Sequence, residues 1–322
     1  MPVDKITRKA QKSGQTQATR VLEMRAVSLK KREKALKTHT KKIEIEARKT
    51  RAAKGGVSRE IVAPAVFTKA ATAGMLVAEG DSWFDYPFHD VLKLLEDDHG
   101  YDVESVARKG DPIEVMAYGD HQLDDFSRCI EKVLRRGDKP KAILLSGGGN
   151  DIAGNEFGML LNHAGSAIAG LNQKIVEGVI DERIRTAFVF IISAVTGICE
   201  KLTGARIPIL VHGYDYPVPD GRGFLGGWGP LPGPWLEPGF REKGFEELIK
   251  RIELIQVLID RFNVMMGGVA TLQGFEHVKY IDLRKTLSNG KDYKKWWGNE
   301  LHPNGDGFSR VTDKFAAVLG GL

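Results

Sequence analysis

Short apolar runs alternate with longer amphipathic stretches from about residue 73 to the end of the chain. Five runs have the length and residue types of buried strands, namely Met75–Gly80, Asp102–Ala107, Lys141–Gly147, Ile207–Gly213 and Val278–Leu283. Helical spacing of apolar residues recurs near His89–Asp98, Leu123–Arg136, Ser166–Thr203, Phe245–Met266 and Gly307–Leu319. Strands that alternate with helices of this length predict βαβ units, a mostly parallel sheet and helices on both of its faces.

The first part of the chain has a different pattern. Residues 15–52 contain no proline and are rich in Lys, Arg, Glu and Ala, which favour a helix. Leu22, Leu29, Leu36 and Ile43 are spaced by seven, as in one seam position of a coiled coil, whereas the second seam position holds mostly residues that pack poorly. This weak heptad predicts an amphipathic helix with a narrow apolar stripe, with a solvated and partly disordered tail as the alternative.

Charge divides the chain at the same place. Residues 1–56 carry 17 Lys and Arg against 5 Asp and Glu, a net charge of +12, so residues 57–322 carry −7 within the total of +5. We therefore expect a basic helical extension with a linker near Ala53–Val57, followed by one α/β domain over residues 57–322. Residues 15–52 could pair with a helix of a protein partner or of a second copy of the chain, lie on an anionic surface, or contact nucleic acid. They contain no aromatic residue, which argues against sequence-specific nucleic-acid binding.

Length and composition set further limits. The chain has 322 residues, 42% of them hydrophobic, which is enough for a sizeable core. Its two cysteines, Cys129 and Cys199, indicate no disulfide framework, and no Cys and His spacing typical of a zinc site occurs. No N-terminal secretory signal is visible, and the longest strongly apolar stretch, Ala187–Ile198, is too short to span a membrane. These features predict a cytoplasmic protein, with export by a route that reads no N-terminal signal left open.

One segment fits neither pattern. Tyr214–Gly244 is dense in Gly and Pro and contains Phe224, Trp228, Trp235 and Phe240. It follows the fourth expected strand and so begins at the carboxyl edge of the sheet, where open α/β sheets bind ligands. We interpret it as a wall or lid over a substrate, and a surface loop packed on its own aromatic side chains is the alternative.

Candidate chemistry gathers at the same edge. Ser82, in Gly-Asp-Ser-Trp, follows the first strand, where a serine on a tight turn can present its hydroxyl group to a substrate. Gly110 follows the second strand, and a glycine there lets a backbone N–H group approach a ligand closely. Taken singly each signal is weak, because Gly-Asp-Ser is also a common turn sequence and loops contain many glycines.

Further polar residues follow the other strands. Asn150 follows the third strand, and its NH₂ group beside a glycine-rich turn can stabilise an oxyanion, although Asn-Asp also suits a turn or a helix cap. His302 follows the fifth strand and offers the base that a serine nucleophile needs. His212 and Asp215, after the fourth strand, point toward the same edge and either bind polar groups of a substrate or are satisfied within their own turn.

The order of these residues is more specific than any one of them. Ser82, Gly110, Asn150 and His302 follow strands one, two, three and five at one edge of one sheet. This arrangement resembles the SGNH (GDSL-like) hydrolase superfamily over about Met75–Leu319. The resemblance implies a three-layer α/β/α flavodoxin-like fold with five parallel strands, here preceded by the basic helical extension. It also implies Ser82 as nucleophile, His302 as base, an oxyanion hole built by the Ser82 and Gly110 N–H groups with the Asn150 side chain, and no metal or cofactor.

Two positions depart from the family pattern. Trp83 stands where the name-giving motif has Leu, outside the chemistry. Asn299 stands three residues before His302, where the family has Asp, and an Asn cannot stabilise an imidazolium as a carboxylate does. One interpretation of this departure is a weak or inactive site. We expect instead that His302 is oriented by a backbone carbonyl group or by one of three carboxylates nearby in sequence: Asp292, Glu300 and Asp306.

Two functions are therefore in competition. The favoured one is an esterase or acyl hydrolase that acts on a lipid, an acylated sugar or another small ester through an acyl-enzyme on Ser82. The rival is a non-catalytic or weakly active module that binds a ligand at the sheet edge and a partner through the basic helix. Asn299 favours the rival, and the intact set of four site residues favours the hydrolase. A third version joins them, with the helix targeting an active hydrolase to an anionic membrane or an assembly.

Overall fold

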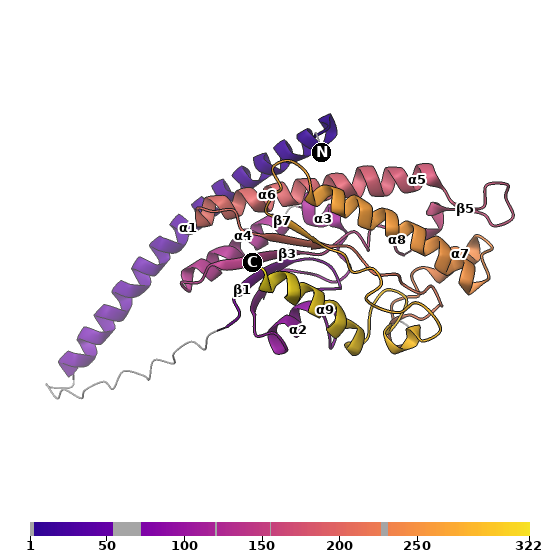
Figure 1. Cartoon of the computed structure of the whole chain (residues 1–322). Coiled ribbons are helices and arrows are strands. Elements are labelled where there is room, and N and C mark those ends of the chain that lie inside the picture. Colours follow the sequence, from indigo (N-terminus) through magenta and orange to yellow (C-terminus); the bar gives the residue numbers. More distant parts are fainter. Residues whose placement is uncertain (1–2, 54–71, 120, 155, 227–230) are drawn as a thin grey trace.

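Five parallel strands form the central sheet of this computed structural model, which describes residues 3–53, 72–119, 121–154, 156–226 and 231–322. The strands are β1 (Met75–Glu79), β2 (Asp102–Ser105), β3 (Pro140–Leu145), β6 (Ile209–His212) and β7 (Val278–Ile281). Their order across the sheet is β2-β1-β3-β6-β7, and β1, β3 and β7 are labelled in Figure 1. Counted along the chain, this is the 2-1-3-4-5 order of flavodoxin-like folds. The expected fold class is confirmed.

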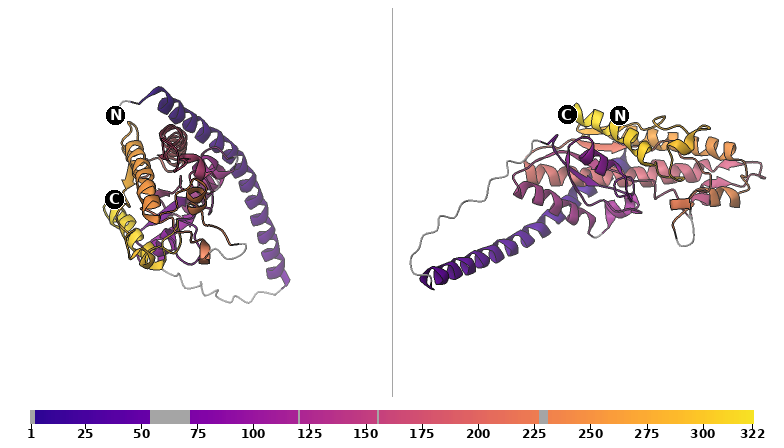
Figure 2. Two further views of the ribbon diagram at one scale, coloured as in Figure 1. Left: turned by 90° about the vertical axis from the view of Figure 1, so that its right-hand side faces the viewer. Right: turned by 90° about the horizontal axis from the view of Figure 1, so that it is seen from below.

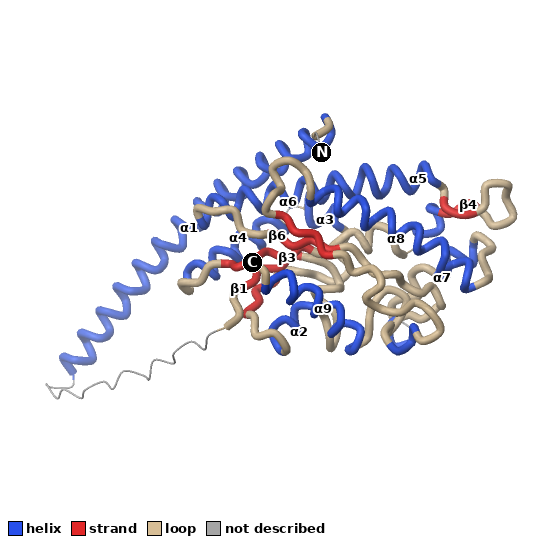
Figure 3. Tube along the Cα trace, viewed as in Figure 1, coloured by secondary structure: helices blue, strands red, loops and turns tan. Residues whose placement is uncertain are grey.

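Helices cover both faces of this sheet (Figure 3). Two of them pack together on one face, α2 (Val91–Asp97) and α9 (Gly305–Gly320). The other face carries α3 (Ile113–Tyr118), α4 (Gln122–Arg135), α6 (Arg185–Thr203) and α8 (Leu248–Ala270). Because helices lie on both sides, the central strands are apolar along nearly their whole length, and every residue of β1 and β6 is buried.

The N-terminal helix α1 (Lys5–Ala53) begins ten residues before the expected start, and its first half packs on α6 and α4. Ala10, Ala18 and Val21 are buried in this contact, and a Cβ atom on Gly14 would lie 2.3 Å from the carbonyl oxygen of Phe190. This half therefore adds a further layer to the domain. Figure 2 shows the second half of α1 extending away from the sheet.

The division at residue 56 stays a prediction, although residues on its N-terminal side contribute to the core. Arg25 of α1 is buried and pairs with Glu131 of α4, with Nη2 and Oε2 2.7 Å apart. The seam residues Leu36 and Ile43 lie outside the described side chains, and most of the expected linker near Ala53–Val57 lies outside the described residues.

The helix expected over Ser166–Thr203 is wrong at its beginning. A short antiparallel pair, β4 (Leu161–Asn162) and β5 (Gly170–Leu171), precedes it, and Gly170 has a φ of 111°, which favours glycine. The Asn172 side chain then accepts a hydrogen bond from the N–H of Ile175 and caps α5 (Gln173–Glu177). A π-helical segment, Gly178–Ile184, connects α5 to α6.

The continuous helical stretch Gln173–Thr203 is long and apolar enough to cross a membrane, judged by length and composition alone, and it is the one such stretch in the described part of the chain. Most of its apolar window is buried inside the protein. The helix packs against α1, α3, α4 and α8, which is the environment of a core helix in an α/β fold.

Candidate active site

Ser82 lies on a tight turn that follows β1. Gly80 begins the turn, and a Cβ atom there would lie 2.8 Å from the Cβ of Ser146, which follows β3, so glycine allows the two strand ends to approach. The Asp81 side chain accepts a hydrogen bond from the N–H of Trp83 at 3.0 Å, and its carbonyl group accepts two more from the residues that follow. The turn leaves Ser82 half-buried at the carboxyl edge of the sheet.

His302 comes from the segment between β7 and α9. The N–H of Gly298 donates to the carbonyl oxygen of His302 at 2.9 Å, so the segment folds back on itself. Asn304 then begins α9, with its side chain accepting a hydrogen bond from the first turn of the helix. In this position, Nε2 of His302 lies 2.7 Å from Oγ of Ser82. The structure thus brings together the serine and the histidine that the sequence analysis paired.

Asn299 lies behind His302, on the side away from Ser82. Its Oδ1 accepts hydrogen bonds from the N–H groups of Leu301 and His302, at 3.0 and 2.9 Å, and Nδ1 of His302 lies 3.1 Å from the same oxygen. Because backbone N–H groups can donate but not accept, the atom that faces His302 is the amide oxygen. Nδ1 therefore carries the hydrogen, and the lone pair of Nε2 faces Ser82. The NH₂ group of Asn299 donates to the hydroxyl group of Tyr86 at 2.8 Å.

The expectation that a nearby carboxylate or a backbone carbonyl group orients His302 is wrong. Asp292 lies 2.5 Å from a serine of the loop after β7, Asp306 is exposed in the first turn of α9, and Glu300 faces the loop after β6. The side chain of Asn299 takes the position instead, because two backbone N–H groups and the imidazole converge on its oxygen.

Burial makes His302 a neutral base. Its ring stacks on that of Tyr86, with centroids 4.2 Å apart and planes 17° apart, and Trp235 lies edge-on at 5.6 Å. Burial with no compensating negative charge lowers the pKa of His302 from 6.5 to about 3. The imidazole is therefore uncharged at neutral pH and can accept the proton of Ser82.

The expected oxyanion donors surround the same point. Ser82, Gly110 and Asn150 line one cavity together with His302. Within the described residues, the backbone N–H groups of Ser82 and Gly110 donate no hydrogen bond, so both are available to a ligand. Gly110 has a φ of 87°, a left-handed conformation that favours glycine. Asn150 uses one of its two amide hydrogens on the carbonyl group of Asp111, at 3.2 Å, which holds the side chain in place.

A second serine–histidine pair lies beneath the first. Oγ of Ser146 lies 2.8 Å from Nε2 of His212 and 2.6 Å from Oδ1 of Asp81, and Nδ1 of His212 lies 2.7 Å from the carbonyl oxygen of Gly213. Desolvation by burial lowers the pKa of His212.

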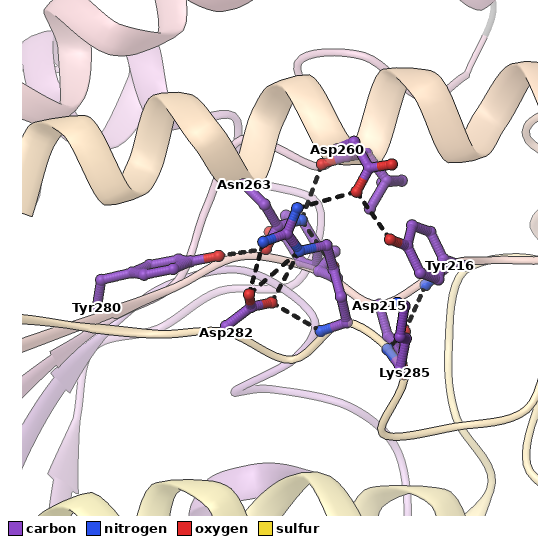
Figure 4. Close-up of polar contacts among 10 residues, drawn as sticks. Asp215, Tyr216, Asp260, Asn263, Tyr280, Asp282 and Lys285 are labelled. Atoms are coloured by element: carbon purple, nitrogen blue, oxygen red, sulfur yellow. Dashed lines mark hydrogen bonds and ion pairs between the residues drawn. The ribbon is translucent and has the colours of Figure 1, made fainter.

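His212 and Asp215 were expected either to bind polar groups of a substrate or to be satisfied within their own turn. The second alternative is closer, because both side chains form their hydrogen bonds inside the protein. Asp215 accepts hydrogen bonds from the N–H groups of Tyr216, Lys285 and Leu287, at 2.8, 2.8 and 2.6 Å. Figure 4 shows Asp215 beside Tyr216 and Lys285. Burial nevertheless raises its pKa to about 6. Asp215 thus joins the loop after β6 to the loop after β7, which leads on to His302.

Glu300 joins the loop Tyr214–Gly244 to the segment that carries His302. Its buried carboxylate accepts hydrogen bonds from four backbone N–H groups of the loop, at distances between 2.7 and 3.0 Å: those of Gly221, Trp235, Leu236 and Glu237. Sequence reasoning missed this role, because a carboxylate beside a histidine in the sequence favours a direct contact between them.

The loop itself is more ordered than its composition indicates. It contains the helix α7 (Glu237–Glu242), and Phe240 packs edge-on against Phe157 at 4.9 Å. Phe224 and Trp235 line a cavity with Ser82 and His302, as expected for a wall of the site. Trp228 lies outside the described residues.

Metal-binding side chains do not gather in the described part of the chain, where no group of three or more His, Cys, Asp or Glu is arranged to hold an ion. Cys129 and Cys199 are both free thiols in the core. Burial raises the pKa of Cys129 to about 11 and that of Cys199 to about 12, so neither is a reactive thiolate at neutral pH.

The fold and this geometry define a flavodoxin-like α/β protein with a Ser–His pair at the carboxyl edge of its sheet. No family model and no curated protein matches the sequence. Solved structures of similar arrangement include an extracellular lipase from Streptomyces rimosus, with 14% identity, a TM-score of 0.44, and 77% of this chain and 99% of the lipase covered.

Two further structures have a similar arrangement. A protein of the G-D-S-L family from Desulfitobacterium hafniense has 14% identity and a TM-score of 0.38, with 76% of this chain and 98% of that one covered. A carbohydrate esterase of family 3 from Talaromyces cellulolyticus has 9% identity and a TM-score of 0.35, with 77% and 99% covered. Similarity at this level transfers neither substrate nor mechanism to this protein.

Proposed function

We propose that this protein is a serine-dependent carboxylic ester hydrolase that works through an acyl-enzyme on Ser82. One observation carries the proposal: Nε2 of a neutral imidazole lies 2.7 Å from Oγ of Ser82. The Asn299 oxygen on the other side of the ring fixes the tautomer that a general base requires. The pair faces two cavities, of about 60 and 360 Å³, and available N–H donors lie beside it.

In the first half-reaction, Oγ of Ser82 attacks the ester carbonyl carbon while Nε2 of His302 takes the hydroxyl proton. The N–H groups of Ser82 and Gly110 and the Asn150 side chain would bind the resulting oxyanion. His302 then returns the proton to the alcohol oxygen as the carbon–oxygen bond breaks. In the second half-reaction, water attacks the acyl-enzyme, His302 takes its proton, and the acid leaves as the Ser82 hydroxyl group is restored.

The imidazolium that forms in each half-reaction has no carboxylate partner. The amide oxygen of Asn299 accepts from its Nδ1–H group, and the face of the Tyr86 ring lies against it, where the aromatic quadrupole attracts a cation. Together these two groups give the imidazolium part of the stabilisation that a carboxylate would give. The proposal therefore includes slower turnover than a comparable Ser–His–Asp site would give.

The steady-state hydrolysis of para-nitrophenyl acetate tests this proposal. The unmodified protein should release para-nitrophenolate, Ser82→Ala should not, and Ser166→Ala should match the unmodified protein. Ser166 is an exposed serine of the loop between β4 and β5 and serves as the matched control. Mass spectrometry of the protein during turnover should find one acetyl group on the peptide that contains Ser82.

The second candidate is a module that binds its ligand without cleaving it, and the observation in its favour is Asn299. A folded protein that binds the ester but neither releases the alcohol nor becomes acylated would support this candidate. In that case Asn299 would be the physical reason, because the imidazolium would form without a counter-charge in a desolvated site.

The remaining expectations stay proposals. They are a cytoplasmic location, a substrate among lipids, acylated sugars or other small esters, self-association, and contact of residues 15–52 with an anionic surface or a protein partner. Deleting the whole extension would remove the core residues of α1. Reversing exposed charges on its second half, with Lys41→Glu and Lys49→Glu, leaves that packing intact and should weaken co-sedimentation with anionic vesicles if a membrane surface is the partner.

A further inference from the structure

Ser82 and His302 lie where two cavities meet. Both cavities are lined by these two residues and by Asn150 and Leu301, while their other walls differ. An ester bound at Ser82 must place its acyl part on one side of the nucleophile and its alcohol part on the other. The two cavities therefore offer a physical account of which ester the site accepts.

The smaller cavity has a volume of about 60 Å³ and is lined mostly by buried residues. Six of its apolar lining side chains are at most 3% exposed: Trp83, Leu236, Ile255, Leu258, Phe262 and Trp297. Two carboxylates also lie in its wall, but Asp81 and Asp215 direct their oxygens to hydrogen bonds within the protein. The space left is apolar and suits a hydrocarbon group.

The volume of this cavity limits the length of that group. An apolar cavity of about 150 Å³ holds benzene, which corresponds to roughly 25 Å³ for each carbon atom. On that scale a cavity of about 60 Å³ holds roughly two or three carbon atoms beyond the ester carbonyl. A longer chain would have to displace side chains of a close-packed core.

The larger cavity, of about 360 Å³, has a different wall. Tyr86, Phe224 and Trp235 are half-buried and present aromatic surface, and Lys109 and Gly110 at its edge are exposed. Between the half-reactions the alcohol must leave the site and water must reach His302, so the alcohol belongs on the side that is open to solvent. Half-buried aromatic side chains bind flat apolar faces, such as those of sugar and aromatic rings.

We infer that the enzyme is selective for esters of short acyl groups, from acetyl to butyryl, carried on a larger alcohol with a flat face. The acyl group enters the smaller cavity beneath Ser82, and the alcohol lies against Tyr86 and Trp235. This inference rests on the proposed ester hydrolysis and adds the class of substrate to it.

A series of para-nitrophenyl esters tests the inference, because the alcohol is constant and aromatic while the acyl chain grows. The expected order of kcat/KM is acetate and butyrate at the top, with octanoate about a hundredfold lower, since a chain that does not fit shifts the carbonyl carbon away from Ser82. Octanoate or laurate cleaved as fast as acetate would overturn the inference.

Two variants alter the cavity in opposite directions. Ile255→Ala opens its wall and should raise the ratio of octanoate to acetate kcat/KM about tenfold. Ala153→Val adds two methyl groups to the lining and should lower the ratio of butyrate to acetate. Val257→Ala is the matched control, because Val257 lies on the same helix, is 53% exposed and does not line the cavity. Its ratios should stay unchanged.

The outcomes separate this inference from the function on which it rests. If the folded protein cleaves no ester in the series and Ser82 is never acylated, the proposed function fails. If esters are cleaved without a preference for short chains, the function stands and the short-acyl inference fails. If Ile255→Ala does not fold, the Ala153→Val ratio still decides, and an unchanged ratio there would show that the acyl group lies elsewhere.

Discussion

Ser82–His302 and Ser146–His212 are two serine–histidine pairs in one core, with oxygen-to-nitrogen distances of 2.7 and 2.8 Å. The first pair faces two cavities and has an amide, Asn299, behind its imidazole. The second is sealed within the core and has a carboxylate, Asp81, beside its serine. The carboxylate thus accompanies the pair that no substrate can reach.

This difference shows that a short serine–histidine contact does not by itself make a nucleophile. The buried pair stabilises the turn that presents Ser82, because Asp81 belongs to both the turn and the buried cluster. Tyr214 extends this support, since its hydroxyl group donates to Asp81 at 2.5 Å and accepts from the N–H of Gly149, next to Asn150, at 3.3 Å. The Ser82–His302 pair has what attack on an ester requires: a neutral histidine as base, cavities for a substrate, and N–H groups that are available to an oxyanion.

The largest expected effect separates the two serines. Ser82→Ala should lower kcat by at least about a thousandfold, because it removes the nucleophile. Ser146→Ala should leave kcat within about tenfold of the unmodified protein but lower the free energy of unfolding by roughly 1–3 kcal/mol, since Asp81 and His212 lose their shared partner. Ester hydrolysis and chemical denaturation measure the two effects. Equal losses of activity in both variants would erase the distinction between the pairs.

The next effect concerns the missing carboxylate. Asn299→Asp places a negative charge beside Nδ1 of His302, which should raise the pKa of the histidine and increase kcat about tenfold or more. Asn299→Ala should lower kcat about a hundredfold, because nothing then fixes the tautomer. Parallel kinetics of the two variants check this account. A decrease in kcat with Asp would contradict it, provided circular dichroism shows the variant to be folded.

The pH dependence sharpens the same comparison. Burial lowers the pKa of His302 from 6.5 to about 3, and the neutral form is the active base, so activity is lost as pH falls through the pKa of the folded protein. The acid limb of kcat/KM should therefore lie well below the ordinary range of histidine. In Asn299→Asp the acid limb should move to higher pH. Profiles of both proteins, recorded down to about pH 4, test this difference.

A smaller effect is expected at Glu300. Glu300→Gln replaces an acceptor oxygen by an NH₂ group that faces backbone N–H groups of the loop Tyr214–Gly244. The loosened wall should raise KM several-fold, with little change in kcat, because the Ser–His contact does not involve this side chain. Glu242→Gln, at an exposed position of the same loop, is the control and should change neither constant. A loss in kcat alone would instead give Glu300 a role in the chemistry.

The periodicity of the sequence was sufficient to predict the sheet and the position of the four site residues, because βαβ topology brings the carboxyl ends of parallel strands to one edge. Ser82, Gly110, Asn150 and His302 follow four of the five strands, so the fold alone gathers them. The orientation of the Asn299 side chain could not be predicted from the sequence, because it depends on two backbone N–H groups that converge only when residues 298–302 fold back.

The role of Glu300 and the packing of α1 on the domain could not be predicted from a single sequence either. Glu300 contacts residues 63–79 positions away, and nothing local indicates such a contact. In α1 the contact with α6 depends on Ala10, Gly14 and Ala18, which are small residues that carry little hydrophobic signal. The spacing of the heptad residues instead favoured an amphipathic helix that contacts a partner or a surface outside the domain.

Mapping of a fluorophosphonate adduct tests the central claim most directly. The purified protein would be treated with the probe near neutral pH, digested and analysed by mass spectrometry, beside Ser82→Ala and His302→Ala. We predict one adduct, on Ser82, that is absent from the first variant and strongly reduced in the second, with Ser146 unmodified in all three. A folded protein that forms no adduct, or one that carries it on another residue, would contradict the claim that His302 activates Ser82.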